Sequence, residues 1–144
     1  MPIAETINDK YIKERVLNFA LNKMGLAYSK LEQYKQSLQF FQQALSKKEL
    51  YLFEKYDILN NIGSVYLKIG DYSRAKEYYQ EALKFSQNLT GDPGANGFIL
   101  NNIGSAHTKM GEYTQALSTY RQALALFQEL KDFPGERATL SNMS

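Results

Sequence analysis

The chain has 144 residues, of which 44% are hydrophobic, enough for about one domain with a core. Its 17 basic and 15 acidic residues leave a formal net charge of +2, which is too small to indicate nucleic-acid or membrane binding. The absence of cysteine excludes disulfide bonds, thiolate catalysis and thiolate metal sites.

The N-terminal segment shows no targeting pattern. No basic leader precedes an apolar stretch, and no run in the chain reaches the roughly 18 apolar residues of a membrane-spanning helix. We therefore expect a soluble, cytoplasmic protein. A first helix is predicted to begin at Asn8-Asp9, because apolar side chains follow at helical spacing. They are Ile12, Val16, Leu17, Ala20, Leu21 and Met24.

From Leu21 onward one pattern recurs: Leu, two residues, Met or Ile, Gly, two residues, and an aromatic side chain. The pattern recurs after 38 and then 41 residues. Self-similarity at such a period predicts a stack of structural repeats, which favours a binding scaffold over an enzyme. The copies are Leu21-x-x-Met24-Gly25-x-x-Tyr28, Leu59-x-x-Ile62-Gly63-x-x-Tyr66, Leu100-x-x-Ile103-Gly104-x-x-His107 and an incomplete Leu140-x-x-Met143-Ser144.

A turn and a second periodic segment follow each complete copy, so every repeat is predicted to be helix, tight turn, helix. The turns are Glu32-Gln33-Tyr34, Gly70-Asp71-Tyr72 and Gly111-Glu112-Tyr113. Because glycine suits the left-handed position after a helix, Glu32 should make its turn less favourable. In the second helices, small and aromatic residues share one face, where they should pack closely. These are Ser37, Phe41 and Ala44; Ala75, Tyr79 and Ala82; Ala116, Tyr120 and Ala123.

These residues and spacings resemble the tetratricopeptide repeat over roughly residues 18 to 144. The resemblance implies an all-α fold, a right-handed superhelix of antiparallel helix pairs in one domain, residues 1–144. Repeat 1 should span about residues 10–50, repeat 2 about 52–90 and repeat 3 about 94–131, with a partial repeat or capping helix at 134–144.

The chain departs from the usual signature in two ways. The closing proline is replaced by Glu49, Gln87 and Gln128, and the anchor spacings of 38 and 41 residues exceed the usual value of about 34. The extra residues fall in 46–55 and 86–97, and the composition of 90–94 and 131–135 predicts turns. Such long-period repeats resemble those of kinesin light chains, polarity adaptors and bacterial regulators. Because the fourth copy stops at Ser144, we expect either a fragment of a longer protein or a short cap.

A second face of the first helices remains after the packing positions are assigned. When helix pairs stack with a constant rotation, this face lines the concave wall of the superhelix. We predict that it forms a groove that binds a peptide or helix of a partner protein. The predicted groove residues are Asn22, Leu26, Lys30, Asn60, Asn61, Ser64, Lys68, Asn101, Asn102, Ser105 and Lys109.

Asparagine amides can pair with the backbone of a bound peptide, and the lysines would favour an acidic segment. Two simpler interpretations stay open: the asparagines bond to a neighbouring helix, and the lysines solvate helix ends. The whole chain could instead serve self-association through exposed repeat ends, or regulate a larger protein of which it is part.

One known binding mode of the family is not expected. Some members hold a C-terminal carboxylate with a two-carboxylate clamp of lysine, asparagine and arginine side chains on three successive first helices. Asn61 fits one place of that clamp, but the other places hold Asn22, Leu26, Phe98 and Asn102.

No pattern in the chain predicts catalysis, a metal or a cofactor. His107 replaces a tyrosine anchor, and no Asp or Glu is expected on its helical face within one turn, so we assign it to packing. No glycine-rich phosphate loop occurs, and most tyrosines lie at anchors or turns, which leaves few to stack on nucleic-acid bases. The acidic residues look like solvated surface; they include Glu32, Glu49, Glu54, Asp71, Glu77, Glu81 and Glu112.

Overall fold

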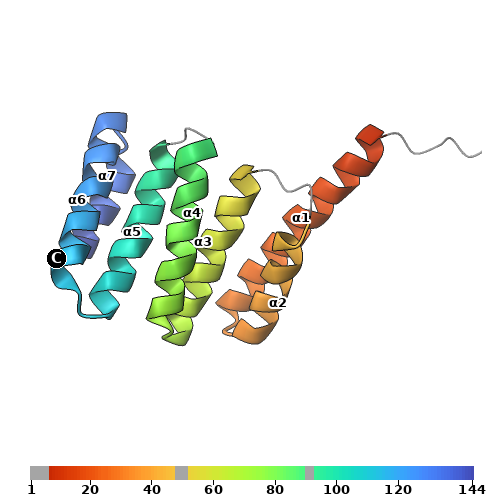
Figure 1. Cartoon of the computed structure of the whole chain (residues 1–144), viewed down its shortest axis with the longest axis horizontal. Helices are drawn as coiled ribbons and strands as arrows, with labels where there is room; N and C mark the ends of the chain where they lie inside the picture. Colours follow the sequence, from red (N-terminus) through yellow and green to blue (C-terminus); the bar gives the residue numbers. More distant parts are fainter. Residues whose placement is uncertain (1–6, 48–51, 90–92) are drawn as a thin grey trace, which may run out of the picture. The chain divides into compact units, whose positions relative to one another are not determined.

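The computed structural model describes residues 7–47, 52–89 and 93–144. These residues form seven α-helices and no strand, which confirms the predicted all-α fold (Figure 1). The chain divides into two compact units, Met1–Glu49 and Leu50–Ser144, and each is described by itself. The assignment of all repeats to a single domain stays a prediction.

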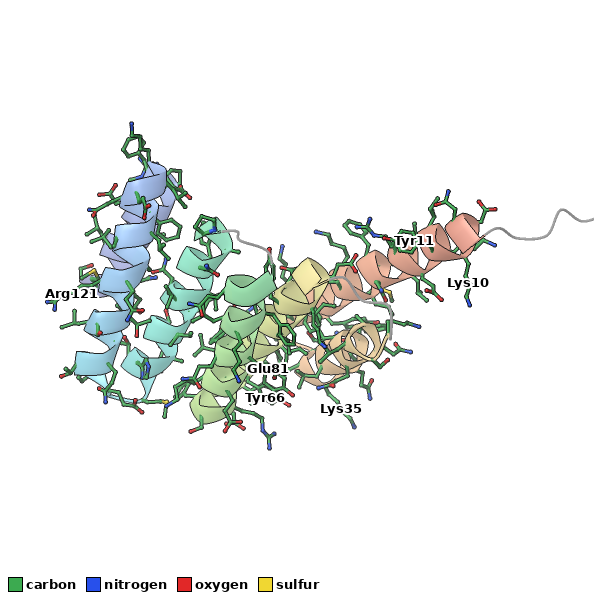
Figure 2. The ribbon with its side chains drawn as sticks, turned by 45° about the horizontal axis from the view of Figure 1, so that its top comes forward. Lys10, Tyr11, Lys35, Tyr66, Glu81 and Arg121 are labelled. Atoms are coloured by element: carbon green, nitrogen blue, oxygen red, sulfur yellow. The ribbon has the colours of Figure 1, made fainter. Side chains whose placement is uncertain are left out.

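The first unit contains α1 (Ile7–Lys30) and α2 (Tyr34–Leu45), which pack against each other. The helix start predicted at Asn8-Asp9 lies within two residues of the observed one. With 24 residues, α1 is twice as long as the 12-residue α2. Its N-terminal part therefore runs on beyond α2, and the labelled Lys10 and Tyr11 lie there (Figure 2).

The second unit contains the helix pairs α3 (Leu52–Ile69) with α4 (Tyr72–Leu89) and α5 (Pro93–Lys109) with α6 (Tyr113–Leu130), followed by α7 (Phe133–Met143). Helix α5 contacts the other four helices of this unit. The first helices α3, α5 and α7 thus follow one another through contacts with α5, and the second helices α4 and α6 pack against them (Figure 1).

Each of the three complete repeats holds its two helices together by the same contact between a glycine and a ring. A Cβ atom added to Gly63 would lie 2.7 Å from ring carbons of Tyr79, a distance that side chains do not tolerate. Gly104 meets Tyr120 in the same way. Both rings are buried, so the glycine lets the second helix approach the first. Gly25 and Phe41 make the corresponding contact in the first unit.

The turns between paired helices follow the predicted rule. Gly70 and Gly111 have φ angles of 97° and 78°, in the left-handed region. Glu32 occupies the same place with a φ of 60°, which is unfavourable for a residue with a Cβ. The less favourable turn predicted for repeat 1 thus corresponds to the left-handed backbone conformation of Glu32.

In repeats 2 and 3 the long period is accompanied by long second helices, since α4 and α6 each have 18 residues, whereas α2 of repeat 1 has 12. The predicted turns at 90–94 and 131–135 are wrong at their ends, because α5 already begins at Pro93 and α7 at Phe133. Proline is well tolerated in the first helical turn, where its missing N–H needs no partner. At α7 the Asp132 carboxylate also accepts a hydrogen bond of 3.0 Å from the Gly135 amide. Residues 90–92 lie outside the described part of the chain.

Candidate functional site

The predicted groove residues of the second unit lie on α3 and α5. Asn60, Asn61 and Asn102 are half-buried, and the lysines near the ends of these helices are exposed. Asn101 is only 5% exposed, and its side-chain oxygen has no hydrogen-bond partner among the described residues. The exposed part of this set thus runs along two adjacent first helices.

Asn60 and Asn102 bring the two helices together. The Nδ2 of Asn102 donates a hydrogen bond to Oδ1 of Asn60 across 2.8 Å. Asn60 and Asn102 therefore do bond to a neighbouring helix, as the simpler of the two interpretations of the asparagines expected. Each amide still has unused capacity, because Asn60 Nδ2 and Asn102 Oδ1 have no partner in the part of the chain that the structure describes.

Ser64 and Ser105 face the second helix of their own repeat. The Tyr79 hydroxyl donates to Ser64 Oγ at 3.0 Å, and Ser105 Oγ lies 3.2 Å from the Tyr120 hydroxyl. Burial raises the pKa of Tyr79 to about 12, although the bond to Ser64 acts in the opposite direction. The two serines therefore help to position buried tyrosines, while remaining partly exposed.

The remaining predicted residues belong to the first unit. Asn22 and Leu26 are half-buried on α1, and Lys30 is the exposed last residue of that helix. Since the two units are described separately, a surface shared by both stays a prediction.

His107 has an acidic neighbour that lies outside its own helix. Its Nδ1 lies 2.8 Å from Oε2 of Glu112, and the other oxygen of this carboxylate lies 3.8 Å from Nζ of Lys76 on α4. Helical spacing relates residues of one helix only, whereas the chain reversal at Gly111 brings Glu112 back to His107. The Glu112 carboxylate thus joins His107 of its own repeat to Lys76 of repeat 2.

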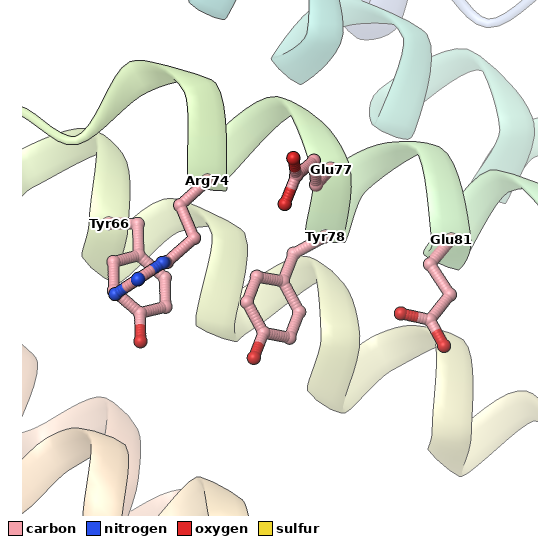
Figure 3. A pocket seen from close by; sticks show the side chains of 5 residues that line it. All are labelled: Tyr66, Arg74, Glu77, Tyr78 and Glu81. Atoms are coloured by element: carbon pink, nitrogen blue, oxygen red, sulfur yellow. The ribbon is translucent and has the colours of Figure 1, made fainter.

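A surface pocket that the sequence analysis missed lies on α3 and α4 (Figure 3). Tyr66 and Tyr78 are stacked in it, with ring centroids 5.5 Å apart and an angle of 12° between the planes. The repeat pattern assigns Tyr66 to packing and does not distinguish Tyr78, and Glu77 and Glu81 resemble ordinary solvated residues in the sequence. The complete lining is Tyr66, Arg74, Glu77, Tyr78 and Glu81.

The described residues give two further findings that bear on function. No helix among them combines the length and the apolar character that a membrane crossing requires. No group of three or more His, Asp or Glu side chains in these same residues is arranged to hold a metal ion.

The comparisons with known proteins identify the repeat. A sequence model of the tetratricopeptide repeat matches residues 17–88 and again residues 54–129. No curated protein matches the sequence.

Two solved structures have a similar fold. The N-terminal domain of stress-induced protein-1 (STI-1) from C. elegans aligns with a TM-score of 0.70 and 14% identity, over 91% of this chain and 98% of that one. BtubC (BKLC) from P. vanneervenii aligns with a TM-score of 0.70 and 21% identity, over 83% of this chain. The alignment spans about half of BtubC, 49% of its length. At these identities the likeness shows the fold alone.

Proposed function

The chain belongs to the tetratricopeptide repeat family, and we propose that it is an interaction module that binds a peptide segment of a partner protein on α3 and α5. Repeats of this family generally mediate protein–protein interaction and form non-enzymatic scaffolds. The proposed binding surface, called the amide surface below, consists of Asn60, Asn61, Lys68, Asn102 and Lys109.

One observation carries the proposal: the bond between Asn60 and Asn102 leaves a donor and an acceptor free on the same half-buried pair. A peptide backbone offers a C=O and an N–H at every residue, which are the complements of these two groups. The mutual bond also restrains both side chains before a ligand arrives, which lowers the entropy lost on binding.

The two lysines support an acidic ligand. Lys68 and Lys109 are exposed in the last turns of α3 and α5, at equivalent places in repeats 2 and 3. Their charges would attract an acidic segment and speed its association, with an effect that weakens as salt rises. The same lysines also lie at the negative ends of their helix dipoles, which already attract their charges. We therefore assign the main peptide contacts to the amides, and to the lysines a preference for acidic peptides.

The test is selection of ligands from a random peptide display library on the whole chain, followed by titration of a selected peptide. We expect Asn60→Ala with Asn102→Ala to lower the affinity at least about tenfold, since two hydrogen bonds of about 1 kcal/mol each are lost. Gln80→Ala with Gln122→Ala is the matched control, because it removes two exposed amides from the second helices. Equal binding by both double variants, with helical circular dichroism intact, would reject the amide surface.

A second candidate function is self-association through α7. Phe133 and Leu140 are 65% and 48% exposed, and their spacing of seven places them on one face of this helix. This candidate predicts a dimer in light scattering at high concentration that Leu140→Lys abolishes. A monomer at all concentrations would exclude it. A regulatory role within a larger protein and a cytoplasmic location stay predictions.

A further inference from the structure

The pocket on α3 and α4 differs from the amide surface, because four of its five lining residues belong to the second helix α4. Figure 3 shows Tyr66 of α3 beside Arg74, with Tyr78 between them and Glu81. Tyr66 and Glu81 are also labelled on the α3–α4 pair in Figure 2. The pocket thus combines a stacked aromatic pair with charged side chains of both signs.

Comparison with repeat 3 shows that repeats 2 and 3 share a pocket at this place, with different side chains lining it. A second surface pocket is lined by His107, Thr114, Gln115, Ser118 and Thr119. Four of these residues lie 41 positions beyond Tyr66, Arg74, Glu77 and Tyr78, the distance between the two repeats. The same hollow is therefore lined by neutral side chains or histidine in repeat 3.

Repeat 1, like repeat 3, has no charged residue at the places of the three charged pocket residues. The places of Arg74, Glu77 and Glu81 are held by neutral residues in both other repeats: Gln36, Gln39 and Gln43 in repeat 1, and Gln115, Ser118 and Gln122 in repeat 3. Repeat 1 does keep the aromatic pair, since Tyr28 and Phe40 stack with centroids 5.2 Å apart. Packing of the helix pair therefore requires none of the three charges of repeat 2.

The positive charge in the pocket is already compensated. The Arg74 guanidinium carbon lies 5.3 Å from the centroid of the Tyr66 ring, and its Nε lies 3.8 Å from Oδ2 of Asp71. A guanidinium over an aromatic ring is a favourable cation–π contact. Arg74 thus covers one ring of the aromatic pair, that of Tyr66.

The negative charges are not compensated. Glu77 and Glu81 lie one turn apart on the exposed face of α4, where like charges repel each other. Neither carboxylate forms an ion pair or hydrogen bond within the described part of the chain. The second aromatic ring, Tyr78, has no cation over it there. The pocket thus offers two carboxylates and one aromatic ring to an incoming cation.

We propose that this pocket binds an arginine side chain in a basic segment of a partner protein. The guanidinium would stack on Tyr78, as Arg74 does on Tyr66, and donate hydrogen bonds to the carboxylates of Glu77 and Glu81. A planar cation with five N–H donors fits a ring and two carboxylates better than the compact ammonium of lysine does. The surface is open and the ion pairs are solvated, so a single arginine binds weakly and gains affinity from neighbouring contacts.

The test uses the full ¹⁵N-labelled chain and follows backbone amide shifts during titration with an oligo-arginine peptide. We expect the shifts to concentrate in residues 74–81, and the equivalent residues 115–122 of repeat 3 to stay unchanged. Oligo-lysine of the same length should bind more weakly, and oligo-glutamate should leave residues 74–81 unaffected. Shifts in neither segment, or shifts of 74–81 with oligo-glutamate, would overturn the proposal.

Four variants distinguish the pocket from general attraction between opposite charges. Glu77→Gln and Glu81→Gln should each weaken oligo-arginine binding about threefold, whereas Glu129→Gln on α6, with the same change in net charge, should not. Tyr78→Thr, which introduces the residue of repeat 3, should weaken binding about threefold as well.

Arg74→Gln should instead strengthen binding about threefold, because it removes a repelling charge and uncovers the ring of Tyr66. Equal losses from all three glutamate variants, or weaker binding with Arg74→Gln, would contradict the proposed geometry. The outcome is independent of the amide surface, whose variants leave all of these residues unchanged.

Discussion

Asn60 and Asn102 are separated by 42 residues in the sequence and joined by a hydrogen bond of 2.8 Å between their side chains. The bond connects α3 to α5, the first helices of two successive repeats. It links the packing of the repeats to the chemistry of the surface that they form.

The bond itself should contribute to the stability of the second unit. Asn60→Ala and Asn102→Ala should each lower the free energy of unfolding by about 1 kcal/mol, and the double variant should lose less than their sum. Urea denaturation of all four proteins gives the coupling energy. Strictly additive losses would mean that the two amides do not interact in solution.

The contact between Gly63 and Tyr79 should not tolerate a methyl group. Gly63→Ala should destabilise the second unit by about 2 kcal/mol, because the added Cβ would lie 2.7 Å from a fully buried ring. In combination with Tyr79→Leu, the same alanine should cost clearly less than it does alone. Chemical denaturation measures both effects, and a stabilising Gly63→Ala, as expected for an open helix position, would contradict the packing.

Burial of Tyr79 should make stability depend on alkaline pH. Because the folded pKa of about 12 lies above the usual tyrosine pKa of 10, between these two pH values the folded chain keeps a proton that the unfolded chain has lost. This contribution is fully present below pH 10 and is lost as the pH rises towards 12, by about 3 kcal/mol in total.

Tyr79→Phe isolates that contribution, since Phe41 occupies the equivalent place in repeat 1. The variant should be less stable than the parent by about 1 kcal/mol at neutral pH, where it lacks the bond to Ser64. The difference should shrink and then reverse above pH 10. If the free energies of unfolding of the parent and of Tyr79→Phe changed in parallel with pH, the phenol would not be buried.

The left-handed turn at Glu32 should be improved by glycine. Glu32→Gly should stabilise the pair of α1 and α2 by about 1 kcal/mol, because only the glutamate has a Cβ that clashes at a φ of 60°. Glu32→Ala keeps that Cβ and should give no such gain. Hydrogen exchange of the α2 amides distinguishes them, and equal protection in both variants would remove the explanation.

The repeat pattern predicts the fold well because packing imposes it. The leucine, glycine and aromatic positions recur at fixed spacing, and Leu59, Leu100, Tyr79 and Tyr120 are buried as expected. Met24 is 42% exposed although Ile62 and Ile103, at the same pattern position, are buried. Where composition replaced pattern, as at Pro93, the helix start was misplaced, since proline marks turns and first helical turns equally.

The candidate sites were harder to predict, because they depend on contacts between segments. Glu112 approaches His107 only through the reversal at Gly111, which a helical-face argument cannot include. Glu77 and Glu81 look like ordinary solvated residues until repeat 2 is compared with its neighbours position by position. That comparison was available in the sequence, whereas the stacking of Tyr66 on Tyr78 was not.

The most direct test of the central claim, that the amide surface binds the partner peptide, is the effect of a library-selected peptide on the side-chain NH₂ signals of the ¹⁵N-labelled chain. Binding at Asn60 and Asn102 predicts that both carboxamide signals shift at the same peptide concentration, together with amides of α3 and α5. Saturated binding that leaves these signals in place and shifts only residues of α4 or α6 would contradict the claim.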